Sequence, residues 1–506
     1  MSTLIQNLQS LAGGNGQLNF NARRFIQENF TRSWVLLLWL VVLFYISGRV
    51  VSGQLTASPI ITIVILLAWL ISLSITAINE VTRRHSLATH WLRDNLYSSF
   101  TNALLTLVLT LLIVSAIRGF WGYAVVRASF STDAEVAAQT LAQWENPGAN
   151  WGAVIDNFRN LMVFRFPREE QWRILTTLFM LIGLAIPSIA IYREQYRRSV
   201  IRRVWTVLWL LSPFVAFILL LGIKDSSFLP WLNPEQFWGG LLLTIIISVF
   251  AIVASFPLGL LLALGRRSQI RGIPAWLTYG AAIAVTIWGL ATSTPQNLEA
   301  ARSLSERILA FWPLMILLIA FLFQRNFNGN VVALGSTLYI EVVRGVPLIT
   351  VLFMSIILFP ILLPPGTEIL GTWRVMVAVA LFAAAYLAEN VRGGLQSISK
   401  GQYEAADAIG LNTFQKYRQI ILPQALRAVI PAIVGQFIGL FKDTTLVAIV
   451  GLLDLLGVAN LISAQPDWLG VRREPYIFIA FIYFVGSAIM AGYSRRLEAR
   501  LGVGER

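Results

Sequence analysis

The residues of this sequence that could do chemistry are a few ionisable side chains set in apolar surroundings. Glu389 follows the apolar stretch 375–388, where it could attract the ammonium group of a substrate or pair with Arg392 one helical turn on. Lys442 and Asp443 interrupt another apolar run and could pair across a subunit interface or with neighbouring residues. A charge in lipid is costly, so each of these groups is a functional candidate.

Two further pairs of polar residues lie beside apolar runs. Glu341 and Arg344 are three residues apart, so they could pair with each other at the membrane edge or line a substrate path. Thr444 and Thr445 could also face a substrate, but hydroxyl groups in a helix often return hydrogen bonds to the preceding turn. For these two threonines a structural hydrogen bond is therefore the alternative to a contact with substrate.

The sequence predicts no catalytic or metal site. It contains no cysteine, which excludes thiol chemistry and disulfides, and its only histidines are His85 and His90 in a polar loop. No cluster of carboxylates suggests a metal site made of oxygen ligands. The pattern G-x-x-x-x-G-K-S/T is absent, so the chain is not expected to bind or hydrolyse ATP itself. We expect neither an enzyme nor a cofactor.

The composition indicates an all-α polytopic membrane protein. Of 506 residues, 57% are apolar and 13% are charged, which is too hydrophobic for a soluble globular protein. About twelve apolar runs are long enough to be transmembrane helices. They lie near residues 34–50, 57–78, 98–117, 174–192, 204–222, 237–264, 274–293, 308–324, 335–362, 373–393, 428–450 and 475–493.

The distribution of basic residues predicts the orientation. The net charge of +14 comes from Lys and Arg that gather between the apolar runs, which favours a membrane protein over a nucleic-acid partner. With both termini in the cytoplasm, the arginine-rich loops face inward and the short outer loops carry only scattered charges. The inward loops include 79–97, 193–203, 265–273 and 394–427.

This topology divides the chain into three parts: a cytoplasmic tail at 1–33, an accessory membrane region at 34–232 and a core at 233–500. The accessory region holds a long outer loop, 118–172, with four tryptophans. This loop could touch an external partner or rest on the bilayer interface through its indole rings.

The stretch 401–423, GQYEAADAIGLNTFQKYRQIILP, is polar although apolar runs flank it. It predicts a helix that ends near Ile409, a left-handed turn at Gly410 and a second short helix capped by Asn412 or Thr413. Pro423 is expected to discourage continuation of that second helix. We therefore expect a helix–turn–helix knob between two spans on the cytoplasmic side.

The segment EAADAIG at 404–410, followed by ILP at 421–423, resembles the EAA coupling motif of ATP-binding-cassette (ABC) importer permeases. In that family a cytoplasmic helix pair inserts into a groove on the ATPase subunit. The resemblance implies that the residues contacting the ATPase are Gly401, Glu404, Ala405, Ala406, Asp407, Gly410, Leu422 and Pro423.

Four flanking segments resemble the polar-amino-acid branch of these permeases. They are WGGLLLTI at 238–245, YIEVVRGVPLI at 339–349, AYLAENVRGG at 385–394 and FKDTTLVAIVGLLDLLG at 441–457. The likeness covers about 237–500, and the first half is more weakly similar to the large permease of importers for acidic and amide amino acids. One departure is a hairpin of two extra apolar runs at 274–330, for which the resemblance implies no role.

The resemblance implies a type I ABC importer permease core in a bacterial inner membrane, working by alternating access. Its expected partners are a pair of cytoplasmic ATPase subunits, a second homologous permease, an external solute-binding protein and membrane lipid. The expected cargo is glutamate, glutamine, aspartate or asparagine. The alternative is an ion-coupled secondary transporter or channel, which would require carboxylate relays and paired broken helices. Glu389 is a single strongly placed membrane carboxylate, which favours the ATP-driven importer.

Overall fold

The protein is described from a computed structural model, which covers residues 100–192, 199–268 and 270–501 together with isolated positions before residue 100. Within these residues the regular secondary structure is helical, and three isolated β-bridges accompany it. The predicted all-α class is confirmed. The tail 1–33 lies outside the described residues, as do nearly all of the apolar runs at 34–50 and 57–78.

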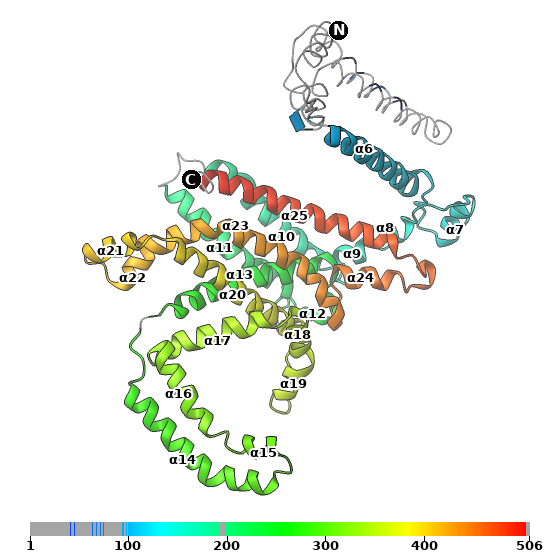
Figure 1. Cartoon of the computed structure of the whole chain (residues 1–506). Coiled ribbons are helices and arrows are strands. Elements are labelled where there is room, and N and C mark those ends of the chain that lie inside the picture. Colours follow the sequence, from blue (N-terminus) through cyan, green and yellow to red (C-terminus); the bar gives the residue numbers. More distant parts are fainter. Residues whose placement is uncertain are drawn as a thin grey trace, which may run out of the picture. The chain divides into compact units, whose positions relative to one another are not determined.

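The chain divides into two compact units, Met1–Trp151 and Gly152–Arg506 (Figure 1). The described elements of the first are α6 (Phe100–Trp121), the π-helical turn η1 (Gly122–Val126) and α7 (Ala134–Ala142). Asp133 caps α7 by accepting a hydrogen bond of 2.9 Å from the backbone N–H of Glu135. Part of the predicted long loop at 118–172 is therefore helical.

Seven helices of the second unit are long and apolar enough to cross a membrane, counted over the described residues. They are α10 (Gln171–Ile191), α11 (Val200–Leu221), α13 (Gly240–Arg266), α14 (Ala275–Ala300), α20 (Gly371–Ser397), the continuous helix Thr413–Val450 and α25 (Arg473–Leu501). At about 1.5 Å per residue, each covers the roughly 30 Å of hydrocarbon. The total of about twelve spans stays a prediction.

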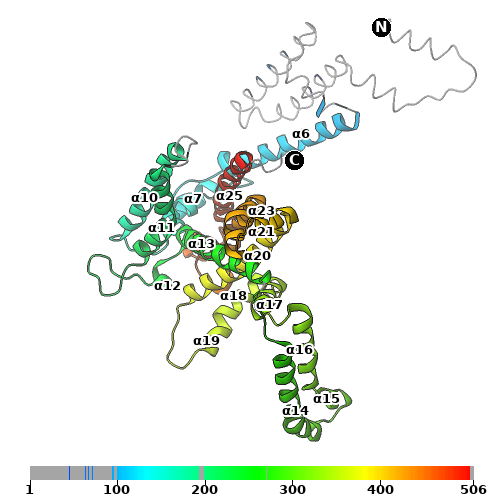
Figure 2. The same cartoon turned by 90° about the vertical axis from the view of Figure 1, so that its left-hand side faces the viewer.

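The centre of the second unit is built from α13, α20, α23 (Leu422–Asp443) and α25, which lie side by side (Figure 2). A Cβ atom on Gly259 of α13 would lie 2.7 Å from Leu387 Cδ2 and 2.8 Å from the carbonyl oxygen of Ala384. Glycine at this position therefore lets α13 and α20 approach closely. Buried residues between these helices include Leu243, Ile247, Val375, Met376 and Val379.

The apolar run predicted at 335–362 is divided into several elements. It contains α17 (Val331–Gly345), α18 (Leu348–Phe353), the π-helical turn η3 (Met354–Leu358) and α19 (Phe359–Leu362). The first break falls before Pro347, where Val346 is extended, because a proline disfavours the α conformation of the residue before it. A single straight span over this run is therefore not formed.

The inserted hairpin consists of α14, α15 (Leu304–Leu309) and α16 (Leu314–Phe327). Helix α14 is joined to the segment between α15 and α16 by hydrogen bonds from Thr286 to the carbonyl oxygen of Pro313 at 3.2 Å and from Thr294 to that of Ala310 at 3.0 Å. Helix α16 meets α17 at a bend of 101°, with left-handed backbone at Asn328 and Gly329. Counted as one span, this bent pair would be the eighth.

Short helices from the first half of the sequence bind the core. They are α8 (Gly152–Asp156) and α9 (Phe158–Val163), which meet α24 (Leu455–Ile462) and the 3₁₀ turn η6 (Pro466–Trp468). The amides of Asn157 and Gln465 hydrogen-bond each other in both directions, at 3.1 and 2.9 Å. Trp468 Nε1 donates to Asp156 Oδ2 at 2.9 Å. A further short helix, α12 (Pro234–Phe237), precedes α13.

Asp454 stands at the junction of α13 and α24. It is fully buried, and its Oδ1 caps α24 by accepting a hydrogen bond of 2.8 Å from the backbone N–H of Gly457. The neighbouring backbone is tied to α13, because the N–H of Gly240 donates to the carbonyl oxygen of Leu453 at 2.8 Å. Burial raises the pKa of Asp454 from 3.8 to about 6.

This raised pKa predicts a pH-dependent stability. Between pH 3.8 and about 6 the folded protein retains a proton on Asp454 that the unfolded chain releases, so stability falls as the pH rises through this window. Asp454→Asn keeps the cap and removes the titration. Between pH 4.5 and 7.5, the Tm of Asp454→Asn in detergent should fall by several degrees less than the Tm of the exposed-site control Asp467→Asn. Identical pH profiles for the two variants would contradict a buried, protonatable Asp454.

Candidate functional site

The predicted knob is present as α21 (Lys400–Ala408) and α22 (Thr413–Lys416). Gly410 adopts the left-handed conformation at φ +76°, as predicted. Its N–H donates to the carbonyl oxygen of Asp407 at 3.0 Å, and the N–H of Leu411 donates to that of Ala406 at 3.2 Å. These two bonds form a Schellman motif, which satisfies the last carbonyls of α21 and fixes the turn.

Two side-chain interactions stabilise the knob. Asn412 caps α22 in a reciprocal box with Gln415, at 2.9 and 3.1 Å, so Asn412 rather than Thr413 is the cap. Lys416 Nζ lies 2.5 Å from Asp407 Oδ1 and bridges α22 to α21. The knob is therefore a compact unit rather than a pair of independent helices.

The tip of the knob is exposed and partly apolar. Ile409 and Phe414 are 70% and 69% exposed, which is unusual for large apolar side chains in a polar loop. Among the residues predicted to contact an ATPase, Ala406 is buried and Leu422 is half-buried. The exposed members of that set are Gly401, Glu404, Ala405, Asp407, Gly410 and Pro423.

The helix that follows the knob does not end at Pro423, contrary to the prediction. A π-helical turn, η4 (Tyr417–Ile421), joins α22 to α23, and Pro423 lies in the first turn of α23. The N–H of Leu422 donates to the carbonyl oxygen of Tyr417, five residues earlier. This wider turn accommodates the proline, which lacks a backbone N–H, so the chain stays helical from Thr413 to Val450.

Glu389 of α20 lies at the centre of an ion-pair cluster that also includes residues at the ends of α13 and α17. It accepts a hydrogen bond of 2.9 Å from Arg392 Nε and lies 3.5 Å from Arg344 Nη1 and 3.6 Å from Arg266 Nη1. Arg266 is also 2.9 Å from Glu341. Of the two roles predicted for Glu389, pairing with Arg392 is therefore the one observed. Glu341 pairs with Arg266 and not with Arg344.

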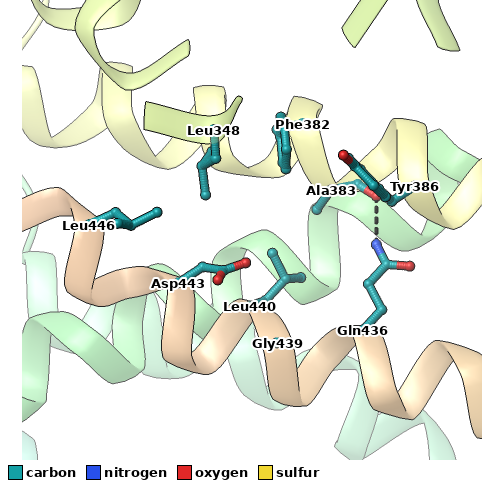
Figure 3. Close-up of a pocket in the computed structure, with 9 residues that line it drawn as sticks. All are labelled: Leu348, Phe382, Ala383, Tyr386, Gln436, Gly439, Leu440, Asp443 and Leu446. Atoms are coloured by element: carbon teal, nitrogen blue, oxygen red, sulfur yellow. Dashed lines mark hydrogen bonds between the residues drawn. The ribbon is translucent and has the colours of Figure 1, made fainter. Parts of the chain in front are cut away.

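A cavity of about 370 Å³ lies between α18, α20, α23 and the 3₁₀ segment η5 (Thr444–Val450) (Figure 3). Its lining is mainly apolar, and Asp443 is the charged member. The carboxyl group points into the space, and the described residues offer it no ion pair. The lining residues are Leu348, Phe382, Ala383, Tyr386, Gln436, Gly439, Leu440, Asp443 and Leu446.

The other polar residues near Asp443 have structural contacts or face away. Thr444 and Thr445 donate to the carbonyl oxygens of Phe441 and Lys442, both at 2.8 Å, so each returns a hydrogen bond to the preceding turn as expected. Lys442 is exposed and does not line the cavity. Of the four candidates at 442–445, Asp443 is the one that reaches the cavity.

Two residues that line the cavity, Tyr386 and Gln436, were not singled out from the sequence. The guanidinium of Arg344 lies over the ring of Tyr386 at 5.7 Å, and Tyr386 lines the cavity. Gln436 Nε2 donates to the carbonyl oxygen of Ala383 at 2.7 Å and joins α23 to α20. Gln436 could have been found as a single amide within the apolar run 428–450. Tyr386 could not have been found in this way, because its role depends on how the helices pack.

Residues 314–503 match the family of binding-protein-dependent transport system inner membrane components. The inner membrane amino-acid ABC transporter permease protein YhdY of Escherichia coli is 34% identical over 419 residues, which are 83% of this chain and 94% of that protein. The chain belongs to the family of amino-acid ABC transporter permeases. It is therefore a multi-pass inner-membrane protein and the translocation subunit of an ABC importer.

A second relative of this permease is the glutamate/glutamine/aspartate/asparagine transport system permease protein BztC of Rhodobacter capsulatus. It is 36% identical over an alignment that covers 82% of the permease and 94% of BztC. Among solved structures, an amino acid ABC transporter crystallised with histidines is 26% identical, covers 52% of the permease and 92% of that chain, and has a TM-score of 0.35.

The ion-pair cluster predicts the effect of removing its central carboxylate. Glu389→Gln leaves the three arginines around it with Glu341 as the remaining acidic partner, so the helix ends repel each other. We expect the free energy of unfolding to fall by about 1–3 kcal/mol, measured as a lower Tm in detergent. The exposed-site control Glu299→Gln should leave Tm unchanged. Equal Tm values for both variants would contradict a stabilising role for the cluster.

Proposed function

We propose that the permease imports a polar amino acid and is driven by cytoplasmic ATPase subunits that bind the α21–α22 knob. The observation that carries this proposal is the knob itself, a rigid helix pair with an exposed apolar tip, inserted between α20 and α23, two of the helices that line the cavity. ATP hydrolysis is assigned to the separate ATPase chains, and the permease is assigned no catalysis of its own.

The connection between knob and cavity supports this assignment. Only Ile398 and Ser399 separate α20 from α21, and α22 continues through η4 into α23 without a break. Helices α20 and α23 carry Tyr386 and Asp443 into the cavity. A displacement of the knob by the ATPase can therefore reach α23 through a continuous helix and α20 across the two-residue link, as alternating access requires.

The orientation in this proposal has both termini and the knob in the cytoplasm. The positive-inside asymmetry supports it, because Arg266 and Arg267 stand at the end of α13 and Arg267 contacts Tyr403 of the knob. Single-cysteine labelling from each side of the membrane tests it, since the chain has no cysteine of its own. A second homologous permease and an external solute-binding protein complete the proposed importer.

The proposed cargo is a polar amino acid such as glutamate, glutamine, aspartate or asparagine, the substrates in the name of BztC. Every such cargo carries an α-ammonium group. We propose that Asp443 pairs with this group, since its carboxylate is the charged group in a largely apolar cavity and has no ion pair among the described residues. Glu389 is less suited to this role because three arginines already surround it.

The knob assignment predicts the effect of reversing a charge on its exposed face. Glu404→Lys should reduce the ATPase that co-purifies with the permease, and ATP-dependent uptake, by at least about tenfold, because a charge reversal at an interface weakens binding. The matched control Glu368→Lys reverses an exposed carboxylate in the loop between α19 and α20 and should change neither quantity. Undiminished ATPase association in Glu404→Lys would sink the coupling assignment.

The cavity assignment predicts a separable defect. Asp443→Asn should retain the ATPase but raise the substrate concentration needed for half-maximal uptake by about tenfold, because a charge-assisted hydrogen bond is replaced by a neutral one. Asp225→Asn, in the exposed loop between α11 and α12, is the control. Uptake of radiolabelled glutamate and glutamine measures the effect, and an unchanged concentration dependence would exclude Asp443 as the ammonium partner.

A further inference from the structure

Arg267, the residue that follows α13, joins three elements at the base of the knob. Its Nη1 donates to the carbonyl oxygen of Leu395 in α20 at 3.1 Å and lies 3.3 Å from the hydroxyl oxygen of Tyr403 in α21. The guanidinium also lies over the Tyr403 ring at 5.7 Å. The hydroxyl of Tyr403 in turn donates to the carbonyl oxygen of Leu395 at 3.2 Å. We name this closed triangle of contacts the Arg267 clasp.

The clasp spans the one break in the path from the knob to α20. Ile398 and Ser399 both have extended backbone, and the side chain of Ser399 makes no capping hydrogen bond to α21. A two-residue extended link between helices can pivot, because its φ and ψ angles are not fixed by helical hydrogen bonds. A pivot there would let the knob move while α20 stays still. Tyr403 sits on α21 just beyond the link, where a fixed contact prevents this rotation.

The residue before Arg267 extends the connection toward the cavity. Arg266 lies within ion-pair distance of Glu341 on α17 and of Glu389 on α20. Arg344 of the same cluster covers the ring of Tyr386, which lines the cavity. Of the two consecutive arginines at the end of α13, Arg267 therefore contacts the knob and Arg266 belongs to the ion-pair cluster.

We propose that Arg267 is a positioning residue for energy coupling: the Arg267 clasp makes α21 move as one body with α13 and α20. Without it, ATPase motion is dissipated at the Ile398–Ser399 link and reaches the cavity only through α23. This inference rests on the proposed role of the knob. It adds to that role a residue outside the knob, at the start of the α13–α14 loop, which transmits the movement of α21 to α13 and α20.

The test uses the importer purified from its host membranes through an affinity tag on the permease, so that its own partners accompany it. Reconstituted vesicles yield the uptake of radiolabelled glutamate and glutamine per ATP hydrolysed. Arg267→Gln should leave the amount of co-purified ATPase unchanged and lower this ratio by at least about fivefold. Tyr403→Phe, which keeps the ring and loses the hydroxyl, should lower it less. The double variant should lose less than the sum of the two single losses, because both changes remove the Arg267–Tyr403 contact, whereas the Tyr403–Leu395 hydrogen bond is lost only with the hydroxyl.

The matched control is Arg325→Gln. Arg325 lies over the ring of Phe321 at 5.8 Å, a similar contact within α16 that crosses no link, and its removal should leave the ratio unchanged. An unchanged ratio in Arg267→Gln would overturn the proposal. So would additive losses in the double variant, or a loss of co-purified ATPase, which would make Arg267 a residue that supports the ATPase-binding surface instead.

A covalent replacement of the clasp separates coupling from folding. Arg267→Cys combined with Tyr403→Cys introduces two thiols into a cysteine-free chain, and a short bis-maleimide can bridge them. The unbridged protein should hydrolyse ATP with little uptake, and bridging should restore the ratio. A bridged protein that remains uncoupled would overturn the proposal. Failure of the knob assignment is distinguishable, because it would appear as normal ATPase association in Glu404→Lys, whatever the ratio in the Arg267 variants.

Discussion

The ion pairs around Glu389 are the interaction on which the core depends. Arg266, Arg344 and Arg392 bring three positive charges to the meeting point of α13, α17 and α20, where they would repel each other without a shared carboxylate. The cluster lies between two functional regions: Tyr386 connects it to the cavity, and the adjacent Arg267 connects it to the knob. A compensated charge cluster can hold helices in register at a membrane surface while its members exchange partners when the helices shift.

The arrangement of elements suits a protein that transmits force. Helices α20 and α23 form walls of the cavity and also lead directly into the two ends of the knob. The knob is stiffened by the turn at Gly410 and by the Lys416–Asp407 ion pair. In the proposed mechanism energy enters at the knob and the ammonium group of the substrate binds at Asp443. This mechanism requires rigidity along α20 and α23.

Local features of the site could be predicted from the sequence, and contacts between distant segments could not. The left-handed turn at Gly410 and the cap at Asn412 follow from residue types within a few positions of each other. The continuation of the helix through Pro423 was missed, because a π-helical turn has no simple sequence signal. The pairing of Glu341 with Arg266 and the cavity around Asp443 depend on how four helices pack, which residue spacing does not determine.

The central claim is that the tip of the knob is covered by a cytoplasmic ATPase. Ile409→Cys would place a single thiol at this exposed tip. The measurement is labelling with a membrane-impermeant maleimide, in right-side-out and inverted vesicles, before and after the ATPase subunits are stripped off. We expect labelling only in inverted vesicles and only after stripping. Labelling from the outer face, or equal labelling with the ATPase still bound, would contradict the account.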